Sequence, residues 1–334
     1  MNDHQYGVAI IGCGLIGQKR AKALQNARLV ACTDLDESKA ARLADQFTGA
    51  VAIADCHGTI NHPDVEIVIA AATNNALAEI TLAAVRAGRH VLVEKPAARF
   101  SSELDEVIKE ANMAGVYVRV GFNHRYHPAF QKARELMDQG KVGELMFIRG
   151  RYGHGGRIGY EKEWRADPRL SGGGELLDQG VHLIDLSRWF MGDFPYVAGS
   201  AHSYYWDMPV DDNGFLMLQT ADHQTAFLQA SCTEWKNLFS FEIYGKKAKL
   251  HIEGLGGSYG VERLSFYKML PQMGPPETII WEYPGGDTSW DLEFAEFLED
   301  IRLQRAPSPG LQDAQAALKI IEKIYKESGY DHHS

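Results

Sequence analysis

The sequence predicts an α/β protein in which a doubly wound parallel sheet is followed by a second domain built on a mainly antiparallel sheet. Residues 7–121 alternate apolar strand-like runs with helical patterns, which is typical of parallel βαβ units. Between 197 and 268 the strand-like runs follow one another with short turns, which favours antiparallel pairing. A chain of 334 residues is long enough for two domains.

The first strand-like run, 8–11, leads directly into a glycine-rich turn. Gly12, Gly14 and Gly17 match the spacing G-x-G-x-x-G, and a helix is expected over 18–24. Gly12 permits a tight turn, Gly14 allows a pyrophosphate to approach the backbone, and Gly17 allows the helix to pack closely on the strand. Free N–H groups at the helix start favour an anion. The segment, including Leu15 and Ile16, is therefore predicted to bind a dinucleotide.

An acidic residue ends the second predicted strand, 29–33. Asp34 follows Gly12 by 22 residues, the spacing at which a carboxylate can bind the adenosine ribose hydroxyls and repel a 2′-phosphate. NAD is therefore favoured over NADP, although Lys39 could soften that preference. The alternative is a solvated loop aspartate.

Two further polar segments follow predicted strands of the same half. Thr73 and Asn74 follow the strand 65–71, at the edge where open α/β sheets bind ligands. Asn74 is a candidate for the nicotinamide ribose or for a cap of the helix 76–87. Glu94 and Lys95 follow the strand 90–93 and precede a proline, so both are expected to project into the ligand crevice. The alternative for this pair is a surface turn.

An aspartate and a histidine share one face of a helix predicted over 175–189. Asp178 and His182 are four residues apart, and Asp185 is placed to orient the imidazole from behind. Histidine titrates near neutrality and suits a general base. A lone helix histidine is more often structural, but the glycine-rich loop before it favours catalysis.

A long loop, 153–175, is rich in glycine, charge and aromatic residues, and loops of this length are usually functional or disordered. Its arginines could clamp a sugar with an attached phosphate or carboxylate, which favours an anionic substrate. The alternative is contacts between subunits. The candidate substrate-binding residues are Lys95, Asn123, Arg125, Tyr152, Arg157, Tyr160, Trp164, Arg165, Asp178, His182 and Lys236.

The glycine-rich turn, Asp34, the Glu94-Lys95-Pro96 triplet, GFNHRYHPAF at 121–130 and the segment 178–182 occur in the order that resembles the Gfo/Idh/MocA family of sugar oxidoreductases. The resemblance implies a Rossmann domain over 1–122 and a substrate-binding and oligomerisation domain over 123–310. It also implies a C-terminal helix, 311–330, that packs back on the Rossmann domain. In this family the second sheet is open on one face, which commonly forms dimer or tetramer contacts.

The resemblance implies hydride transfer between a secondary ring hydroxyl and NAD, with Lys95, Asp178 and His182 as the catalytic residues. His182 would act as the base, Lys95 would stabilise the alkoxide, and Asp178 would hold a neighbouring hydroxyl. We expect a nucleotide-activated sugar oxidised at C3. The alternatives are an inositol or free-aldose dehydrogenase, a redox-neutral NAD-dependent glycosidase, and a non-catalytic NAD-binding sensor.

Composition limits the remaining classes. A net charge of −10 disfavours partners such as nucleic acid or an anionic membrane. The sequence has no stretch apolar enough for a membrane span and no signal-peptide pattern at its start, and its four cysteines are scattered. We therefore expect a cytoplasmic homodimer or homotetramer that acts on a small molecule. No pattern of metal-ligand spacing is present.

Overall fold

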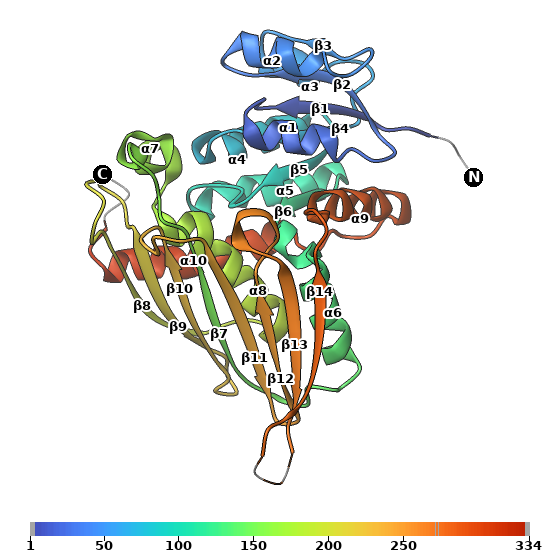
Figure 1. Ribbon diagram of the computed structural model, residues 1–334. Coiled ribbons are helices and arrows are strands. Elements are labelled where there is room, and N and C mark those ends of the chain that lie inside the picture. The colour runs from blue at the N-terminus through green and yellow to red at the C-terminus, as the bar shows by residue number, and fades with distance from the viewer. Residues whose placement is uncertain (1–3, 271, 273, 331–334) are drawn as a thin grey trace. The chain divides into compact units, whose positions relative to one another are not determined.

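The computed structural model describes residues 4–270, 272 and 274–330 (Figure 1). The chain packs as two compact units. The first unit comprises the residues up to Phe122 together with Trp290–Leu318, and the second comprises Asn123–Ser289 together with the residues from Lys319 on. The expected division instead placed 290–310 in the second domain. We propose that the two units, and not the expected three-part division, are the functional domains.

The first unit contains a parallel sheet of six strands in the order β3-β2-β1-β4-β5-β6. Nearly all side chains of β1, β2, β4, β5 and β6 are buried, as expected for parallel strands covered on both faces. This order is that of a doubly wound dinucleotide-binding fold, so the predicted fold of this half is confirmed. The strands are β1 (Gly7–Ile11), β2 (Arg28–Thr33), β3 (Val51–Ala52), β4 (Ile67–Ala70), β5 (His90–Glu94) and β6 (Val118–Gly121).

The helices of this unit include one from far along the chain. Phe294 and Phe297 of α9 belong to the same buried cluster as Val8 and Ile10 of β1, which is why this helix packs with the first unit. The helices are α1 (Leu15–Lys22), α2 (Glu37–Ala44), α3 (Cys56–Ile60), α4 (Asn74–Arg86), η1 (Ser101–Glu103), α5 (Leu104–Ala114) and α9 (Ser289–Leu303), followed by the start of α10 (Leu311–Glu327).

The second unit contains an eight-stranded sheet in the order β14-β13-β12-β11-β7-β10-β9-β8. All neighbours are antiparallel except β7 and β10, so the predicted mainly antiparallel sheet is confirmed. The sequence analysis did not predict β14, an exposed edge strand between two loops. The strands are β7 (Leu145–Gly153), β8 (Tyr196–His202), β9 (Asn213–Gln219), β10 (Thr225–Ser231), β11 (Leu238–Gly245), β12 (Ala248–Glu253), β13 (Glu262–Lys268) and β14 (Glu277–Tyr283).

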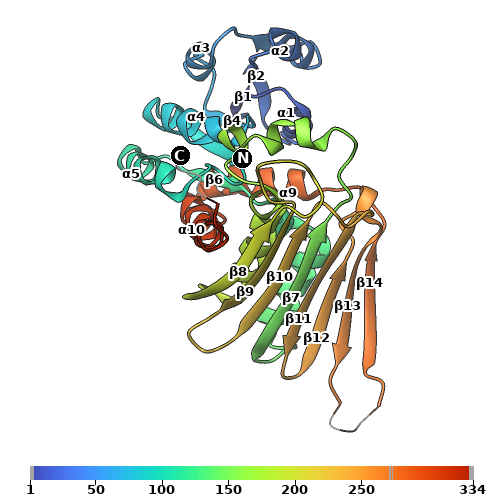
Figure 2. The same ribbon diagram turned by 90° about the vertical axis from the view of Figure 1, so that its left-hand side faces the viewer.

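Helices α6 and α8 contact this sheet, and Figure 2 shows its other face, which is not covered by them. Met217 and Phe227 are about half exposed. The predicted loop 153–175 contains three short helices. The helical segments of this unit are η2 (Asn123–Tyr126), α6 (Pro128–Asp138), η3 (Tyr160–Lys162), η4 (Trp164–Ala166), α7 (Pro168–Ser171), η5 (Leu176–Gly180), α8 (Val181–Met191), η6 (Gly257–Tyr259) and the end of α10.

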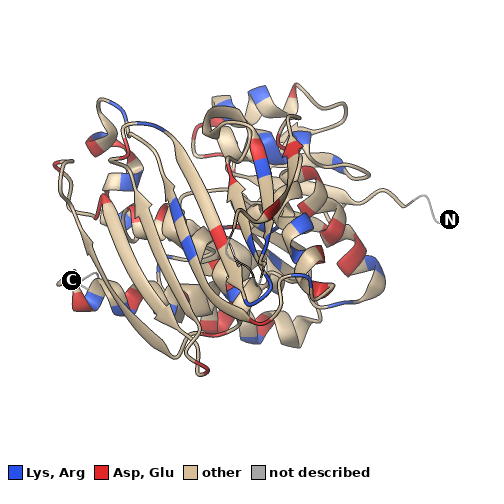
Figure 3. Cartoon of the chain, turned by 60° about the horizontal axis from the view of Figure 1, so that its bottom comes forward, with Lys and Arg blue, Asp and Glu red and all other residues tan. Residues whose placement is uncertain are grey.

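Basic and acidic residues are interspersed along the strands and helices of both units (Figure 3). Among the residues that the structure describes, no helix combines the length and apolarity that a membrane crossing requires.

Candidate functional site

The three glycines of the β1–α1 turn have different surroundings. Gly12 has a φ of +96°, and a Cβ added there would lie 2.4 Å from the Ala71 carbonyl oxygen. A Cβ on Gly17 would lie 1.9 Å from the Gly12 carbonyl oxygen, whereas a Cβ on Gly14 would meet no atom within 4 Å. Gly12 and Gly17 are thus required by the turn itself, and the open space at Gly14 fits a dinucleotide pyrophosphate.

The carboxylate of Asp34 is held beside this turn. Its Oδ2 accepts a hydrogen bond from the Cys13 N–H at 2.7 Å, and its Oδ1 accepts one from the Asp36 N–H at 2.9 Å. The contact with Asp36 is local, whereas the contact with Cys13 links Asp34 to the glycine-rich turn, 21 residues earlier in the chain. This orientation supports the predicted contact with the adenosine ribose.

We expect Asp34→Ala to weaken NADH binding about 10- to 100-fold, the usual loss for hydrogen bonds to a charged group. The discrimination against NADPH should fall with it, because the repelling carboxylate is gone. Fluorescence titration with both reduced cofactors measures the effect, with Glu37→Ala as the control on the neighbouring exposed carboxylate. Unchanged NADH affinity would contradict the assignment.

The remaining predicted cofactor residues of the first unit follow β4 and β5. Thr73 precedes α4 and donates its hydroxyl to Asn75 Oδ1 at 2.7 Å, while Asn74 is buried as the first residue of that helix. Glu94 belongs to β5, and its Oε1 accepts a hydrogen bond from Arg20 Nε at 2.6 Å. Lys95 is half-buried directly after the strand. The pair expected to project together is therefore divided, because the Glu94 carboxylate is bound inside the unit.

Asp178 and His182 lie in the second unit, but not on one regular helix. Asp178 belongs to η5, a single π-helical turn, and His182 to α8, which continues from it. π-Turns within helices occur often at functional sites. The His182 ring is buried and stacks on His124, with ring centroids 3.8 Å apart and planes 25° apart. The sequence analysis gave His124 no specific role.

Asp185 and the substrate candidates Arg125 and Asn123 have partners within the second unit. Asp185 accepts two hydrogen bonds from Arg125, at 2.8 and 2.6 Å, so its carboxylate is held by Arg125, and its orienting role towards His182 stays a prediction. Arg125 is itself buried in this ion pair. The Asn123 amide donates to Ser289 Oγ at 2.8 Å. Arg125 and Asn123 therefore support the structure of the second unit, whereas Tyr152 is buried with its ring 6.2 Å from that of His182.

The loop arginines expected to clamp an anion are paired with carboxylates of the same unit. Arg157 binds Glu163 at 2.7 Å, Arg165 Nε lies 3.0 Å from Asp178 Oδ2, and Arg169 binds Asp167 at 2.8 Å. Trp164 is half-buried next to Arg165, and Lys236 is exposed. The three arginines of the expected cationic clamp thus each have a carboxylate partner in the same unit.

A buried carboxylate that the sequence analysis did not single out lies beside this group. Glu175 is contacted by the Tyr160 hydroxyl at 3.4 Å and by His154 Nε2 at 3.5 Å. Burial lowers the pKa of His154, but the hydrogen bond and the negative charge of Glu175, together with the charge of Asp178, raise it by a larger amount. The pKa of His154 is therefore raised overall. The only sequence signal for Glu175 was its position after three glycines.

The glycine-rich segment before η5 is held by a second buried carboxyl group. Asp211 accepts hydrogen bonds from the Gly174 N–H at 3.0 Å, the Leu176 N–H at 2.8 Å and the Tyr325 hydroxyl at 2.6 Å. A Cβ on Gly174 would lie 1.9 Å from the Asp211 carbonyl oxygen. Asp211 therefore positions the start of the turn that carries Asp178. Burial raises the pKa of Asp211 to about 6.

The raised pKa of Asp211 predicts a pH-dependent stability. The folded chain binds a proton on Asp211 more tightly than the unfolded chain does, because the pKa of this carboxyl is about 6 when folded and 3.8 when unfolded. Protonation of Asp211 therefore stabilises the fold fully below pH 3.8, and this stabilisation is lost as the pH rises through about 6. The unfolding free energy of Asp211→Asn, minus that of the wild type, should therefore increase by up to about 3 kcal/mol from pH 4 to 7. Urea unfolding followed by circular dichroism measures it, and a constant difference would contradict the prediction.

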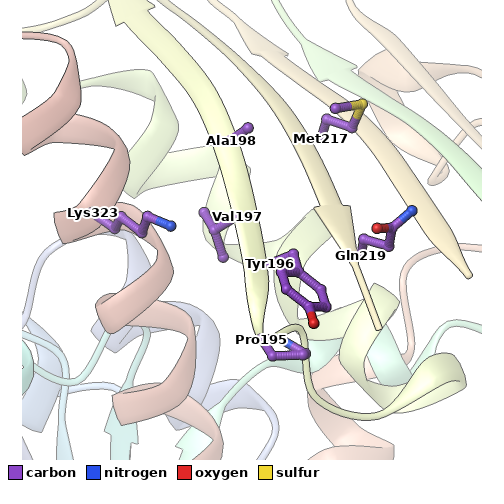
Figure 4. A pocket seen from close by; sticks show the side chains of 7 residues that line it. All are labelled: Pro195, Tyr196, Val197, Ala198, Met217, Gln219 and Lys323. Atoms are coloured by element: carbon purple, nitrogen blue, oxygen red, sulfur yellow. The ribbon is translucent and has the colours of Figure 1, made fainter. Parts of the chain in front are cut away.

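A separate pocket lies at the β8–β9 end of the second sheet (Figure 4). None of its lining residues is a predicted site residue, so it is not the site described above. It is lined by Pro195, Tyr196, Val197, Ala198, Met217, Gln219 and Lys323. Within the described part of the chain, no group of three or more His, Cys, Asp or Glu side chains is arranged to hold a metal ion.

Comparison with known proteins bears on both units. Residues 6–122 match the model of the oxidoreductase family with an NAD-binding Rossmann fold, and residues 130–251 match the GFO/IDH/MocA C-terminal domain. The chain is 33% identical over 202 residues to inositol 2-dehydrogenase 2 of Saccharopolyspora erythraea, which covers 59% of this chain and 56% of that protein. The match thus spans just over half the length of that relative.

Levoglucosan dehydrogenase of Pseudarthrobacter phenanthrenivorans is 28% identical over 395 residues, with 97% of each chain covered. A solved structure of levoglucosan dehydrogenase in complex with NADH and levoglucosan superposes with a TM-score of 0.88, covering 97% of this chain and 98% of that one at 23% identity. At this identity the structural likeness establishes the fold.

The two family models together span most of the chain, in the order in which its sequence motifs occur. The chain therefore belongs to the Gfo/Idh/MocA family of NAD-dependent oxidoreductases.

Proposed function

We propose that this protein is an NAD-dependent dehydrogenase that oxidises a secondary hydroxyl group of an uncharged cyclic polyol or sugar. The observation that carries the substrate class is the pairing of Arg157, Arg165 and Arg169 with carboxylates, because an anionic substrate would have to compete with these partners. The named relatives support the same choice, since inositol and levoglucosan carry no charge. An inositol or free sugar is thus favoured over a nucleotide-activated sugar.

The cofactor is held by the β1–α1 turn and Asp34. The open space at Gly14 accommodates the pyrophosphate, the start of α1 at Leu15 and Ile16 offers backbone N–H groups, and Asp34 accepts the ribose hydroxyls. Thr73 and Asn74 follow β4 at the same sheet edge. When bound, NAD supplies the acceptor for the hydride.

Three side chains carry the proton and charge transfer in this proposal. His182, whose ring is stacked on His124, accepts the hydroxyl proton of the substrate. The Lys95 ammonium group stabilises the developing alkoxide and shares in the proton transfer. Asp178, oriented by Arg165, accepts a hydrogen bond from a neighbouring substrate hydroxyl.

The test is a substrate panel followed at the reduced-nicotinamide absorbance band. It contains inositols, levoglucosan and free aldoses as uncharged substrates, and UDP-sugars as anionic ones. We expect NAD reduction with at least one uncharged compound, at a kcat/KM about tenfold or more above any UDP-sugar, because an unneutralised diphosphate finds no clamp. The reverse order would overturn the proposed substrate class.

A glycosidase or a sensor would give a different result in the same panel. A redox-neutral glycosidase would release nitrophenol from nitrophenyl glycosides in the presence of NAD without accumulating NADH. A sensor would bind NAD in calorimetry but turn over none of the compounds. Either result would replace the proposed dehydrogenase activity.

We also propose that two or more copies associate through the uncovered face of the second sheet. Met217 of β9 and Phe227 of β10 are large apolar side chains left about half exposed there. Light scattering coupled to size exclusion measures the assembly, and Met217→Glu with Phe227→Glu should shift it to the monomer. A wild-type monomer at micromolar concentration would contradict this proposal.

A further inference from the structure

A buried cluster of three charged side chains lies in the first unit. Arg20 of α1 donates from Nε to Glu94 Oε1 and from Nη1 to Glu293 Oε2, both at 2.6 Å. Relative exposure of the three side chains is 1% for Arg20, 9% for Glu94 and 0% for Glu293. The cluster thus joins α1, the last residue of β5 and α9, and it connects residues 273 positions apart in the sequence.

The guanidinium group of Arg20 is confined on its remaining sides. Its carbon lies 4.4 Å from the centroid of the Trp290 ring, which belongs to α9. On β6, a Cβ added to Gly121 would lie 2.6 Å from Arg20 Nη2. Gly121 pairs with Glu94 in the sheet, so the absence of a side chain there leaves the space that the guanidinium group fills.

The charges of the cluster do not balance. One guanidinium group faces two carboxylates, and burial together with Glu94 raises the pKa of Glu293 despite the opposing effect of Arg20. Apolar residues of similar volume often serve at least as well as a buried ion pair for stability. Stability alone is therefore a poor reason for this arrangement, and its position suggests another one.

The cluster lies between the two functional segments of this unit. Arg20 is on the helix that follows the glycine-rich turn, and Glu94 directly precedes Lys95. Glu94 is the last residue of β5 and Lys95 the first residue after it, so anchoring the Glu94 side chain restrains the backbone from which Lys95 leaves the strand. Proton and charge transfer depend steeply on such placement, since a shift of about 1 Å can cost about 100-fold in rate.

We propose that Arg20 and Glu293 are positioning residues, which act through Glu94 to fix Lys95 relative to the cofactor-binding turn. This inference rests on the role given to Lys95 in the proposed function. It assigns Glu94 to this anchoring and not to a cofactor contact. Because Glu293 is a residue of α9, the packing of this helix with the first unit would then contribute to the position of Lys95.

Three variants of the full-length protein test the proposal. Glu293→Gln removes one charge with little change in shape, Arg20→Lys keeps the charge but loses the two-sided contact, and Gly121→Ala displaces the guanidinium group without changing any charge. With the substrate found in the panel, each should lower kcat about tenfold or more, while substrate KM and NAD affinity stay within about threefold. Arg20→Lys should recover more activity than Arg20→Met.

The matched control is a second buried ion pair of the same unit. Arg119 of β6 binds Asp300 of α9, both side chains are 1% exposed, and neither contacts Glu94. The charge of Arg119 lowers the pKa of Glu293, and Arg119→Lys keeps that charge. Arg119→Lys and Asp300→Asn should change stability by amounts similar to the cluster variants. They should leave kcat within about twofold of the wild type, because neither acts on Lys95.

A readout independent of activity separates this inference from the proposed function. In the NAD-loaded protein, the acetylation rate of Lys95 by acetic anhydride is measured by mass spectrometry relative to the exposed Lys141. The cluster variants should change this ratio about threefold or more, and the control variants should not. A ratio unchanged in Glu293→Gln, which is the variant least disturbing to folding, would overturn the inference. A wild type without turnover would overturn the proposed function, while the labelling still decides on the positioning.

Discussion

Lys95→Ala is expected to lower kcat by about 10³-fold or more. The lysine both stabilises the alkoxide and shares in proton transfer, and each of these contributions is usually worth about 10²-fold or more. NAD affinity should change by less than about threefold, because the Gly14 turn and Asp34 carry most of the cofactor binding. Steady-state kinetics and fluorescence titration with NADH measure the two quantities.

The control for this variant is Lys141→Ala, which removes an exposed lysine and should leave both quantities unchanged. A kcat of Lys95→Ala within tenfold of the wild type would contradict the role of Lys95. A loss of NAD binding as large as the loss of turnover would mean that the lysine acts on the cofactor and not on the reacting hydroxyl.

His182→Ala is expected to lower the rate of substrate oxidation by about 10²- to 10⁴-fold, the usual contribution of a general base. Its pH profile should also change. In the wild type the rate falls at acid pH because a protonated imidazole cannot accept the substrate proton. The variant should lose the levelling-off of this limb, and its rate should instead keep rising in proportion to hydroxide concentration across the whole pH range. Initial rates across the pH range measure both effects.

The exposed His57 of α3 provides the comparison, since His57→Ala removes an imidazole that lies in the other unit and outside the described site. His57→Ala should keep the wild-type rate and pH profile. If the rate of His182→Ala still rose and then levelled off with pH as in the wild type, that pH dependence would belong to another group, and the buried His182 ring stacked on His124 would be structural.

The sequence predicted the features that depend on local backbone geometry. The glycine-rich turn was predictable because a φ of +96° at Gly12 and the close approach at Gly17 exclude any side chain. The parallel sheet was predictable because buried strands read as apolar runs between helical patterns. Asp34 was predictable because its spacing from Gly12 follows from the length of one βαβ step, and its two backbone donors were a consequence of that position.

The partners of the charged side chains were decided only by the tertiary structure. The pairing of Arg165 with Asp178, and that of Arg125 with Asp185, could not be read from the sequence. The chain has 34 basic and 44 acidic residues, and no local pattern tells which pairs meet. The π-helical turn before α8 was likewise invisible, because it depends on packing and not on residue spacing.

The sequence by itself thus determined the fold class and the glycine-rich turn, since glycine sterics and apolar periodicity act over a few residues, whereas the candidate catalytic residues followed from the resemblance to the family. The tertiary structure decided the charge available to a substrate and the anchoring of Glu94 by Arg20 and Glu293. Those features depend on side chains up to 273 positions apart, which only the packing of α9 on the first unit brings into contact.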